Sequence, residues 1–230
     1  MKGLLVTLAT LLVLAIAADR LSLVLAEHAV ATQLQTSGSL STKPHVSIRG
    51  IPFLTQALSG KYDDIELSAS DVTAGGGRIS RFDASLRGVH LPLSEALSGS
   101  VATVPVDRLS ATVLLTYADL ESQVRDRRLK LSPAGSLLRV TGSVQVLGRT
   151  VSASALSSVT LKGTTVVVSA TRFEVGHSAA DRLVSAALAG RLDFVVRIGT
   201  LPYGLRLTGV RVRPEGVVAT ASATSTVLHR

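Results

Sequence analysis

Hydrophobic and polar positions follow three patterns along this chain, and each pattern predicts a different kind of element. Residues 3–18 are apolar apart from two threonines. Residues 19–35 place Leu21, Val24 and Leu25 near one face at helical spacing, which predicts an amphipathic helix. After a linker rich in Ser and Thr, apolar and polar side chains alternate over long stretches. That alternation is typical of strands with one buried face.

The alternating segments predict a mostly antiparallel β structure with a few helices. Strands are expected at 45–49, 62–73, 79–91, 104–117, 137–147, 150–161, 164–175, 203–213 and 217–226. Helices are expected at 52–58, 92–97, 117–124 and 179–188. Short turns join most of the strands, so hairpin pairing is expected. Strands this long must curl around something or stack. The two long predicted helices, at 19–35 and 179–188, are expected to fill the space inside the sheet. We therefore predict an α+β fold, in which a long, curved antiparallel sheet wraps around one or two helices.

Composition narrows the picture of the core. Of the 230 residues, 46% are hydrophobic but only 3% are aromatic, and there is no Trp. Aromatic rings usually fill the centre of a core because each buries a large area. A β-rich chain with so few rings is compatible with a sheet that surrounds a cavity. Tight packing of small aliphatic side chains is the alternative.

Charge and cysteine usage exclude several classes of partner and site. The chain carries 24 basic and 16 acidic residues, a formal charge of +8. The basic residues are spread along the strands and lack stacking aromatics, so nucleic acid is not expected as a partner. A membrane surface with anionic lipid headgroups remains a partner for such a chain. Without Cys, the chain has no disulfide, thiolate metal site or lipidated N-terminal Cys.

The N-terminal segment, residues 1–18, predicts export. A single Lys2 precedes the apolar run, which is typical of a signal peptide or a membrane anchor. Ala15 and Ala17 form a small-x-small cleavage site. Cleavage after Ala17 is favoured, and retention as an anchor is the alternative. In both cases residues 19–230 form one domain in an extracytoplasmic location within the cell envelope.

Catalytic and metal-binding chemistry is not expected. Ser178 follows a predicted strand and opens a predicted helix, like the nucleophile of a hydrolase, and Asp193 and His229 follow in the matching order. The simpler interpretation makes Ser178 a helix N-cap with Asp181 three residues later. The strands around it pair by hairpins, which also favours a cap. The five histidines lack metal-ligand spacing, so we predict no metal, no cofactor and no catalytic residue.

A basic group in the last third of the chain is the candidate for binding an anionic headgroup. Alternate residues of a strand share a face, so Arg211 and Arg213 project together. Guanidinium groups bind phosphate through paired hydrogen bonds. A solvated strand face is the alternative for each. The full set of candidates is Arg197, Arg206, Arg211 and Arg213.

Several short motifs follow one another in order along the chain: DRL at 19–21, AE at 26–27, GIPFLTQ at 50–56, RLSAT at 108–112, YADL at 117–120, VTG at 140–142, VLG at 146–148, LPYGL at 201–205, GV at 209–210 and PEGV at 214–217. This ordered set resembles the LmeA-like family of bacterial phospholipid-binding proteins. The resemblance implies an extracytoplasmic lipid-binding protein related in architecture to tubular lipid-binding domains. In those, a curved antiparallel sheet wraps a helix and leaves an apolar tunnel. It implies no catalytic residues.

The resulting hypothesis is a protein that holds a phospholipid, expected to be anionic, by its acyl chains in an apolar tunnel, for lipid carriage or for maintenance of envelope lipids and glycolipids. Phe53 and Leu54 are expected to seal one end of the tunnel. A lipid esterase using Ser178 and a structural envelope protein are the alternatives. Lipid headgroup and oligomeric state are left open. The expected tunnel residues are Phe53, Leu54, Ile65, Leu67, Leu109, Val113, Leu115, Val140, Val144, Val166 and Val168.

Overall fold

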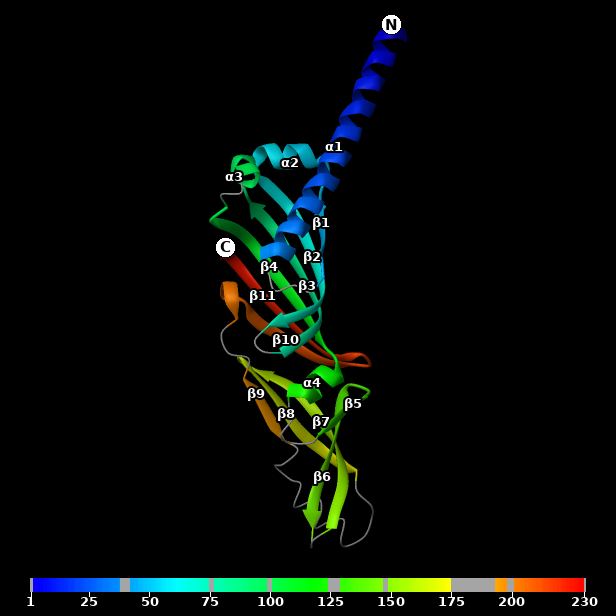
Figure 1. Ribbon diagram of the computed structural model, residues 1–230, viewed down its shortest axis with the longest axis vertical. Helices are drawn as coiled ribbons and strands as arrows, with labels where there is room; N and C mark the ends of the chain where they lie inside the picture. The colour runs from blue at the N-terminus through cyan, green and yellow to red at the C-terminus, as the bar shows by residue number, and fades with distance from the viewer. Residues whose placement is uncertain are drawn as a thin grey trace. The chain divides into compact units, whose positions relative to one another are not determined.

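A computed structural model of the chain has an α+β fold, as the hydrophobic pattern predicts (Figure 1). It describes residues 2–37, 42–74, 77–98, 101–123, 129–146, 149–174, 193–197 and 201–229. The helices are α1 (Lys2–Ser37), α2 (Phe53–Ser59), α3 (Leu93–Ser98) and α4 (Tyr117–Gln123), with a short 3-10 turn at Pro202–Gly204.

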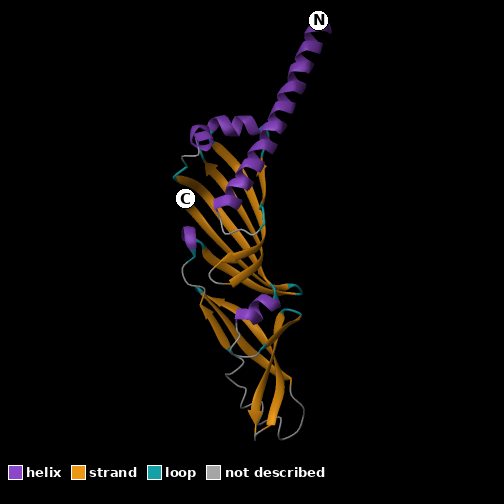
Figure 2. Ribbon diagram, in the orientation of Figure 1, coloured by secondary structure: helices purple, strands orange, loops and turns teal. Residues whose placement is uncertain are grey.

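The strands form two antiparallel sheets, shown in orange in Figure 2. The six-stranded sheet has the order β1-β2-β3-β4-β11-β10, and the five-stranded sheet has the order β5-β6-β7-β8-β9. Their bounds are β1 (His45–Arg49), β2 (Lys61–Ala74), β3 (Gly77–His90), β4 (Thr103–Leu115), β5 (Lys130–Ala134), β6 (Leu137–Val146), β7 (Arg149–Lys162), β8 (Thr165–Glu174), β9 (Phe194–Arg197), β10 (Arg206–Arg213) and β11 (Gly216–His229).

The expected elements and the observed ones agree closely where alternation is long. Each long strand lies within a few residues of its predicted bounds, and antiparallel pairing is confirmed. Two short strands, β5 and β9, were not predicted, because four or five residues carry too little alternation to recognise. The predicted helix at 179–188 and Ser178 lie outside the described residues.

Helix α1 contains two segments that the sequence pattern predicts as separate elements. The apolar run and the amphipathic helix form one continuous helix, Lys2–Ser37. In Figure 1 its first half projects past α2, and its second half lies beside β1. Among the described helices, α1 is the one long and apolar enough to cross a membrane.

The chain divides into two compact units. Unit 1 comprises Met1–Ser70, Asp83–Ala111 and Ala223–Arg230, and unit 2 comprises Asp71–Phe82 and Thr112–Ser222. Strands β2, β3, β4 and β11 contribute residues to both. The expectation of one domain over 19–230 stays a prediction.

The core of unit 1 lies between α1, α2 and the sheet. Val46 and Ile48 of β1 are buried there, with Ala31 of α1 beside them. Glu27 of α1 accepts a hydrogen bond from the backbone N–H of Ile48 at 2.8 Å. The second half of α1 is therefore tied to β1 by both apolar packing and a hydrogen bond.

The core of unit 2 lies between the five-stranded sheet, α4 and β10. Val140 and Ala155 are fully buried, and Val212 of β10 packs against the same cluster. Ser157 is also fully buried, and its hydroxyl has no hydrogen-bond partner among the described residues. A buried hydroxyl without a partner loses its hydration and gains nothing in exchange.

Replacing Ser157 by Ala should therefore raise the free energy of unfolding by about 1 kcal/mol, because it removes the unpaired hydroxyl. Chemical denaturation followed by circular dichroism measures the change. Ser158→Ala is the matched control, since Ser158 is only half-buried and its hydroxyl donates to the Ser169 carbonyl at 3.4 Å. A loss of stability in Ser157→Ala larger than in the control would contradict the prediction.

Candidate functional site

The segment between β1 and β2 is built around the side-chain amide of Gln56. The side chain is 8% exposed, and its Nε2 donates to the Arg49 carbonyl at 3.3 Å while its Oε1 accepts from the Asp63 N–H at 2.9 Å. Gly50, with φ of 107°, lies against this amide. A Cβ at position 50 would come within 2.4 Å of Nε2. The two ends of the GIPFLTQ motif therefore act together: Gln56 supplies the buried amide, and Gly50 leaves room for it.

Helix α2 begins one residue later than predicted, at Phe53, and ends at Ser59, followed by Gly60 as a C-cap in the left-handed conformation. Pro52 precedes it, with no side-chain cap and a cis peptide bond to Ile51. The N–H of Leu54 instead donates to Asp19 Oδ1 of α1 at 2.8 Å. Asp19 is 5% exposed and also pairs with Arg20. An acceptor from a distant helix thus replaces a local cap.

Phe53 occupies the end of the unit 1 core. It is 5% exposed, and its ring centroid lies 6.3 Å from that of Tyr62, with the planes tilted by 38°. Burial raises the pKa of Tyr62. This pair places two of the few aromatic rings of the chain together, where α2 meets β2. The position agrees with a plug at one end, although the sealing role stays a prediction.

The expected tunnel residues in unit 1 lie on one apolar face. Ile65 pairs with Ile48 across the sheet, and Leu67 pairs with Val46. Directly opposed residues of antiparallel strands share a face, so both pairs point to the side that α1 covers. Ile65, Leu67 and Leu54 are half-buried against this core, and Leu109 is buried at 5% exposure.

The expected tunnel residues in unit 2 divide into two groups. Val113 and Leu115 are half-buried at the end of β4. Val140, Val166 and Val168 belong to the five-stranded sheet and are buried at 0%, 9% and 3% exposure. Val144 lies on β6, but its side chain is outside the described set. The structure therefore does not gather all the expected residues on one sheet. Their role as tunnel liners stays a prediction.

Three of the four candidate arginines share one face of β10, at an edge of the six-stranded sheet. An odd separation in sequence would place Arg206 and Arg211 on opposite faces of a regular strand. The register with β11 shifts by one residue between Leu207 and Gly209, and this irregularity returns Arg206 and Arg211 to the same face. The β11 partners of Arg206, Arg211 and Arg213 therefore all lie on one face: Ser222, Val218 and Gly216.

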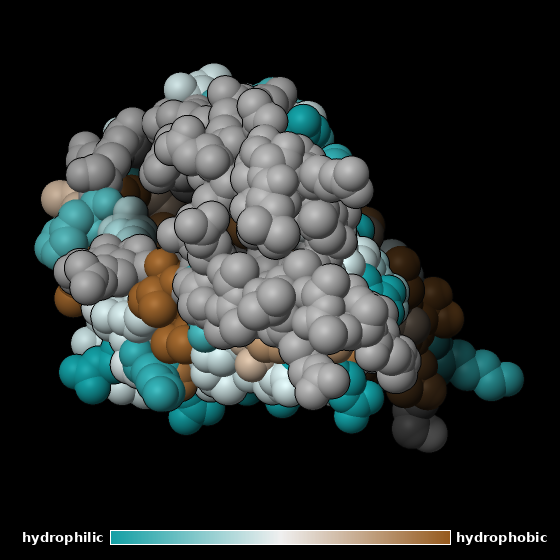
Figure 3. Space-filling view, turned by 90° about the horizontal axis from the view of Figure 1, so that it is seen from below, coloured by the Kyte–Doolittle hydropathy of each residue, from teal (hydrophilic) through white to brown (hydrophobic). Residues whose placement is uncertain are grey.

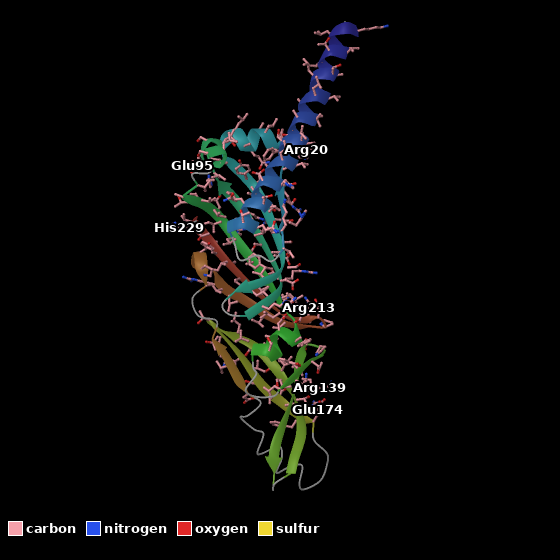
Figure 4. All side chains as sticks on the ribbon, in the orientation of Figure 1. Arg20, Glu95, Arg139, Glu174, Arg213 and His229 are labelled. Atoms are coloured by element: carbon pink, nitrogen blue, oxygen red, sulfur yellow. The ribbon has the colours of Figure 1, made fainter. Side chains whose placement is uncertain are left out.

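The three guanidinium groups are exposed on the polar face, and Val212 of the same strand is buried on the other face. In the described part of the chain none of the three forms an ion pair. Arg213 is labelled in Figure 4. Arg197 lies on β9, with its side chain outside the described set. The basic group thus faces away from the apolar face of its own strand.

A joint in unit 2 links α4 to the turn between β10 and β11. Thr116 and Asp119 cap α4 reciprocally: the Asp119 N–H donates to Thr116 Oγ1 at 3.2 Å, and the Thr116 N–H donates to Asp119 Oδ2 at 3.1 Å. Burial alone would raise the pKa of Asp119, but hydrogen bonds from Ser80 and Thr116 lower it overall. Tyr117 donates its hydroxyl to the Arg213 carbonyl at 2.5 Å.

The same joint explains a glycine in the PEGV motif. A Cβ on Gly216 would lie 2.1 Å from the Leu115 carbonyl oxygen, so the start of β11 can approach the end of β4 only without a side chain. The YADL and PEGV motifs, far apart in the sequence, therefore meet in one structural contact.

A model of the family described as LmeA-like phospholipid-binding matches residues 17–222. The chain belongs to the LmeA-like phospholipid-binding family. The match confirms the resemblance carried by the short motifs. No curated protein and no solved structure matches the chain.

In this LmeA-like protein, the motifs are largely structural joints. They contribute Asp19, Gly50, Gln56, Tyr117 and Gly216, each of which fixes one element against another. Sequence reasoning missed the roles of Asp19 and Gln56, since polar residues in an apolar context signal a buried hydrogen bond without naming its partner. Among the described residues no group of three metal-ligating side chains occurs.

Phe53→Ala should lower the free energy of unfolding by about 3 to 5 kcal/mol, because it leaves a cavity where a buried ring stood. Leu58→Ala is the matched control on the same helix, since Leu58 is 76% exposed and should change stability little. Thermal and denaturant unfolding measure both variants. Equal effects of the two substitutions would show that Phe53 is not part of the core.

Proposed function

We propose that this LmeA-like protein holds a phospholipid by its acyl chains outside the cytoplasm and exchanges it with membranes. The observation that carries the proposal is the match to a phospholipid-binding family over residues 17–222. The apolar core of unit 1 supports it physically. Several large aliphatic side chains around that core remain half-buried: Leu23, Leu34, Leu54, Ile65, Leu67 and Leu86.

Half-buried aliphatic side chains can still lose contact with water when an acyl chain lies against them. Each further CH₂ group removed from water contributes about 0.8 kcal/mol. Leu23 and Leu34 come from α1, while Ile65 and Leu67 come from β2, so an acyl chain would contact both helix and sheet. We assign the acyl chains to this α1-covered face of unit 1.

The energetics favour exchange rather than permanent capture. Two chains of about sixteen carbons gain roughly 25 kcal/mol over water at ~0.8 kcal/mol per CH₂. A bilayer offers nearly the same gain, so the net free energy of transfer is close to zero. Such a protein shields the acyl chains in transit and releases them to an acceptor membrane.

The apolar half of α1 supports a membrane-associated, extracytoplasmic location. Its large side chains, such as Leu5, Val13 and Ile16, are more than half exposed. An exposed apolar helix of this length is compatible with either a signal peptide or an anchor. In Figure 3 brown, hydrophobic residues also appear at the surface among teal, hydrophilic ones.

We assign no catalysis to the chain, and an esterase reaction at Ser178 remains the rival hypothesis. Hydrolysis of a short-chain ester by the wild type, abolished in Ser178→Ala, would favour the rival. Mass spectrometry of lipid extracted from the purified protein tests the proposed function directly, since intact phospholipid is expected.

The arginines on β10 are better suited to docking on an anionic surface than to a headgroup seated on the apolar face. Arg206, Arg211 and Arg213 are exposed on the polar face, without ion pairs to described residues. Each basic side chain near an anionic membrane contributes about 1 kcal/mol of attraction. We propose that they increase contact with anionic acceptor membranes.

Leu67→Trp should reduce uptake of a fluorescent phospholipid by the delipidated protein at least tenfold. The larger side chain displaces about two CH₂ groups of the ligand at ~0.8 kcal/mol each, where 1.4 kcal/mol corresponds to tenfold. Ser68→Trp is the matched control, since Ser68 is exposed on the opposite face of the same strand. If folded Leu67→Trp and Ser68→Trp took up the lipid equally well, the acyl chains would not bind at the α1-covered face of unit 1.

Arg211→Glu combined with Arg213→Glu should slow lipid transfer to anionic vesicles by roughly tenfold or more, given about 1 kcal/mol per basic residue. Transfer to neutral vesicles should not change, and added salt should remove the difference. The control, Lys162→Glu with Arg172→Glu, changes the net charge equally at two other exposed positions. If the control variant slowed lipid transfer equally, net charge alone would explain the effect, and the position of Arg211 and Arg213 would not matter.

A further inference from the structure

The loops and short helices at one end of unit 1 expose aliphatic side chains and carry one charged residue, Glu95. We call residues 51–60 and 91–98 the α2–α3 shelf. Its exposed aliphatic side chains are Ile51 at 84%, Leu58 at 76% and Leu97 at 79% exposure. In a chain of charge +8, residues 51–60 carry no charge, and residues 91–98 carry only Glu95, which is half-buried. Exposed apolar surface with few charges is typical of sites that meet another protein or a membrane.

Helix geometry directs these side chains away from the body. Phe53, Gln56 and Ala57 are buried at helical spacing, so this face of α2 packs onto unit 1. Leu58 lies off that face and points outward. On α3, Leu93 packs against the core while Leu97 is exposed. The shelf therefore presents its aliphatic side chains to the surroundings.

The shelf is fixed to α1 at the residue where the apolar run ends. The Leu54 N–H donates to Asp19 Oδ1 at 2.8 Å, directly after residues 3–18. The two short helices are also joined, since the Leu91 N–H donates to the Gly60 carbonyl at 2.8 Å and a Cβ on Gly60 would lie 3.0 Å from Pro92 Cα. In Figure 4, Arg20 lies beside the junction of α1 and α2, and Glu95 lies on α3.

The length of the apolar run brings the shelf to the membrane surface. At 1.5 Å per residue, residues 3–18 span about 24 Å. The hydrocarbon core of a bilayer is about 30 Å thick, which leaves roughly 6 Å unmatched. A short span draws flanking residues toward the bilayer or thins it locally. The shelf flanks this span directly, because Asp19 holds it there.

We propose that the α2–α3 shelf docks into the headgroup region of the bilayer that holds residues 3–18, with Ile51, Leu58 and Leu97 in contact with lipid. The occupant is a lipid bilayer, and neutral lipid suffices because the surface is nearly uncharged. The inference rests on the membrane-associated location in the proposed function and on retention of residues 3–18 as an anchor, the alternative to cleavage after Ala17, but not on the capture of acyl chains. The docked shelf would hold the core of unit 1 against the bilayer surface.

The chain has no Trp, so a single introduced Trp is a unique fluorescent probe. The unprocessed full chain is reconstituted in phosphatidylcholine vesicles with or without brominated acyl chains. Probes are Leu58→Trp and Leu97→Trp on the shelf, Leu12→Trp in the apolar run, and Ser68→Trp on the body. Ser68 follows Gly60 by about 26 Å of strand at ~3.3 Å per residue, which is beyond the headgroup region.

The proposal expects a blue shift and quenching by brominated lipid for the two shelf probes and for Leu12→Trp, with no change for Ser68→Trp. Quenching of Leu12→Trp alone would overturn the shelf proposal, leave the membrane location standing and indicate another occupant, such as a partner protein. An unquenched Leu12→Trp would overturn the membrane location and the shelf together. Quenching of Ser68→Trp as well would overturn selective docking.

Discussion

The first turn of α2 depends on a carboxylate from another helix, and much of unit 1 is arranged around that hydrogen bond. The first N–H groups of a helix have no partner within the helix. Pro52 offers no side-chain cap, and Asp19 of α1 accepts from Leu54 in its place. This contact lies at the end of the apolar run. There the half of α1 that projects meets the half that packs against β1.

Three further contacts extend this constraint through unit 1. Glu27 binds the backbone of β1, Gln56 connects β1 to β2, and Gly60 allows α2 to approach α3. Each satisfies a buried polar group or removes a steric conflict, which a marginally stable fold requires. At this end of the core Phe53 and Tyr62 are packed inside, and aliphatic side chains such as Leu58 are exposed outside.

Several residues of the motifs that identify the family form contacts between distant segments. Gly50, Gln56, Tyr117 and Gly216 each hold two distant segments together. Gly50 and Gln56 hold β1 and β2 together beside the apolar core of unit 1, and Tyr117 and Gly216 hold α4 and β4 against β11 in unit 2. The family model, described as LmeA-like phospholipid-binding, spans all of these joints, since it matches residues 17–222.

The long strands, their antiparallel pairing and the N-terminal apolar helix could be predicted from the amino-acid sequence, because alternation and continuous hydrophobicity are local signals. The family could be recognised as well, since the motifs occur in a fixed order. Three features became visible in the folded chain alone: the division into two sheets, the partner of Asp19, and the register shift that places Arg206 on the face of Arg211. These depend on contacts between residues distant in the chain, and no local pattern encodes which distant group will be near.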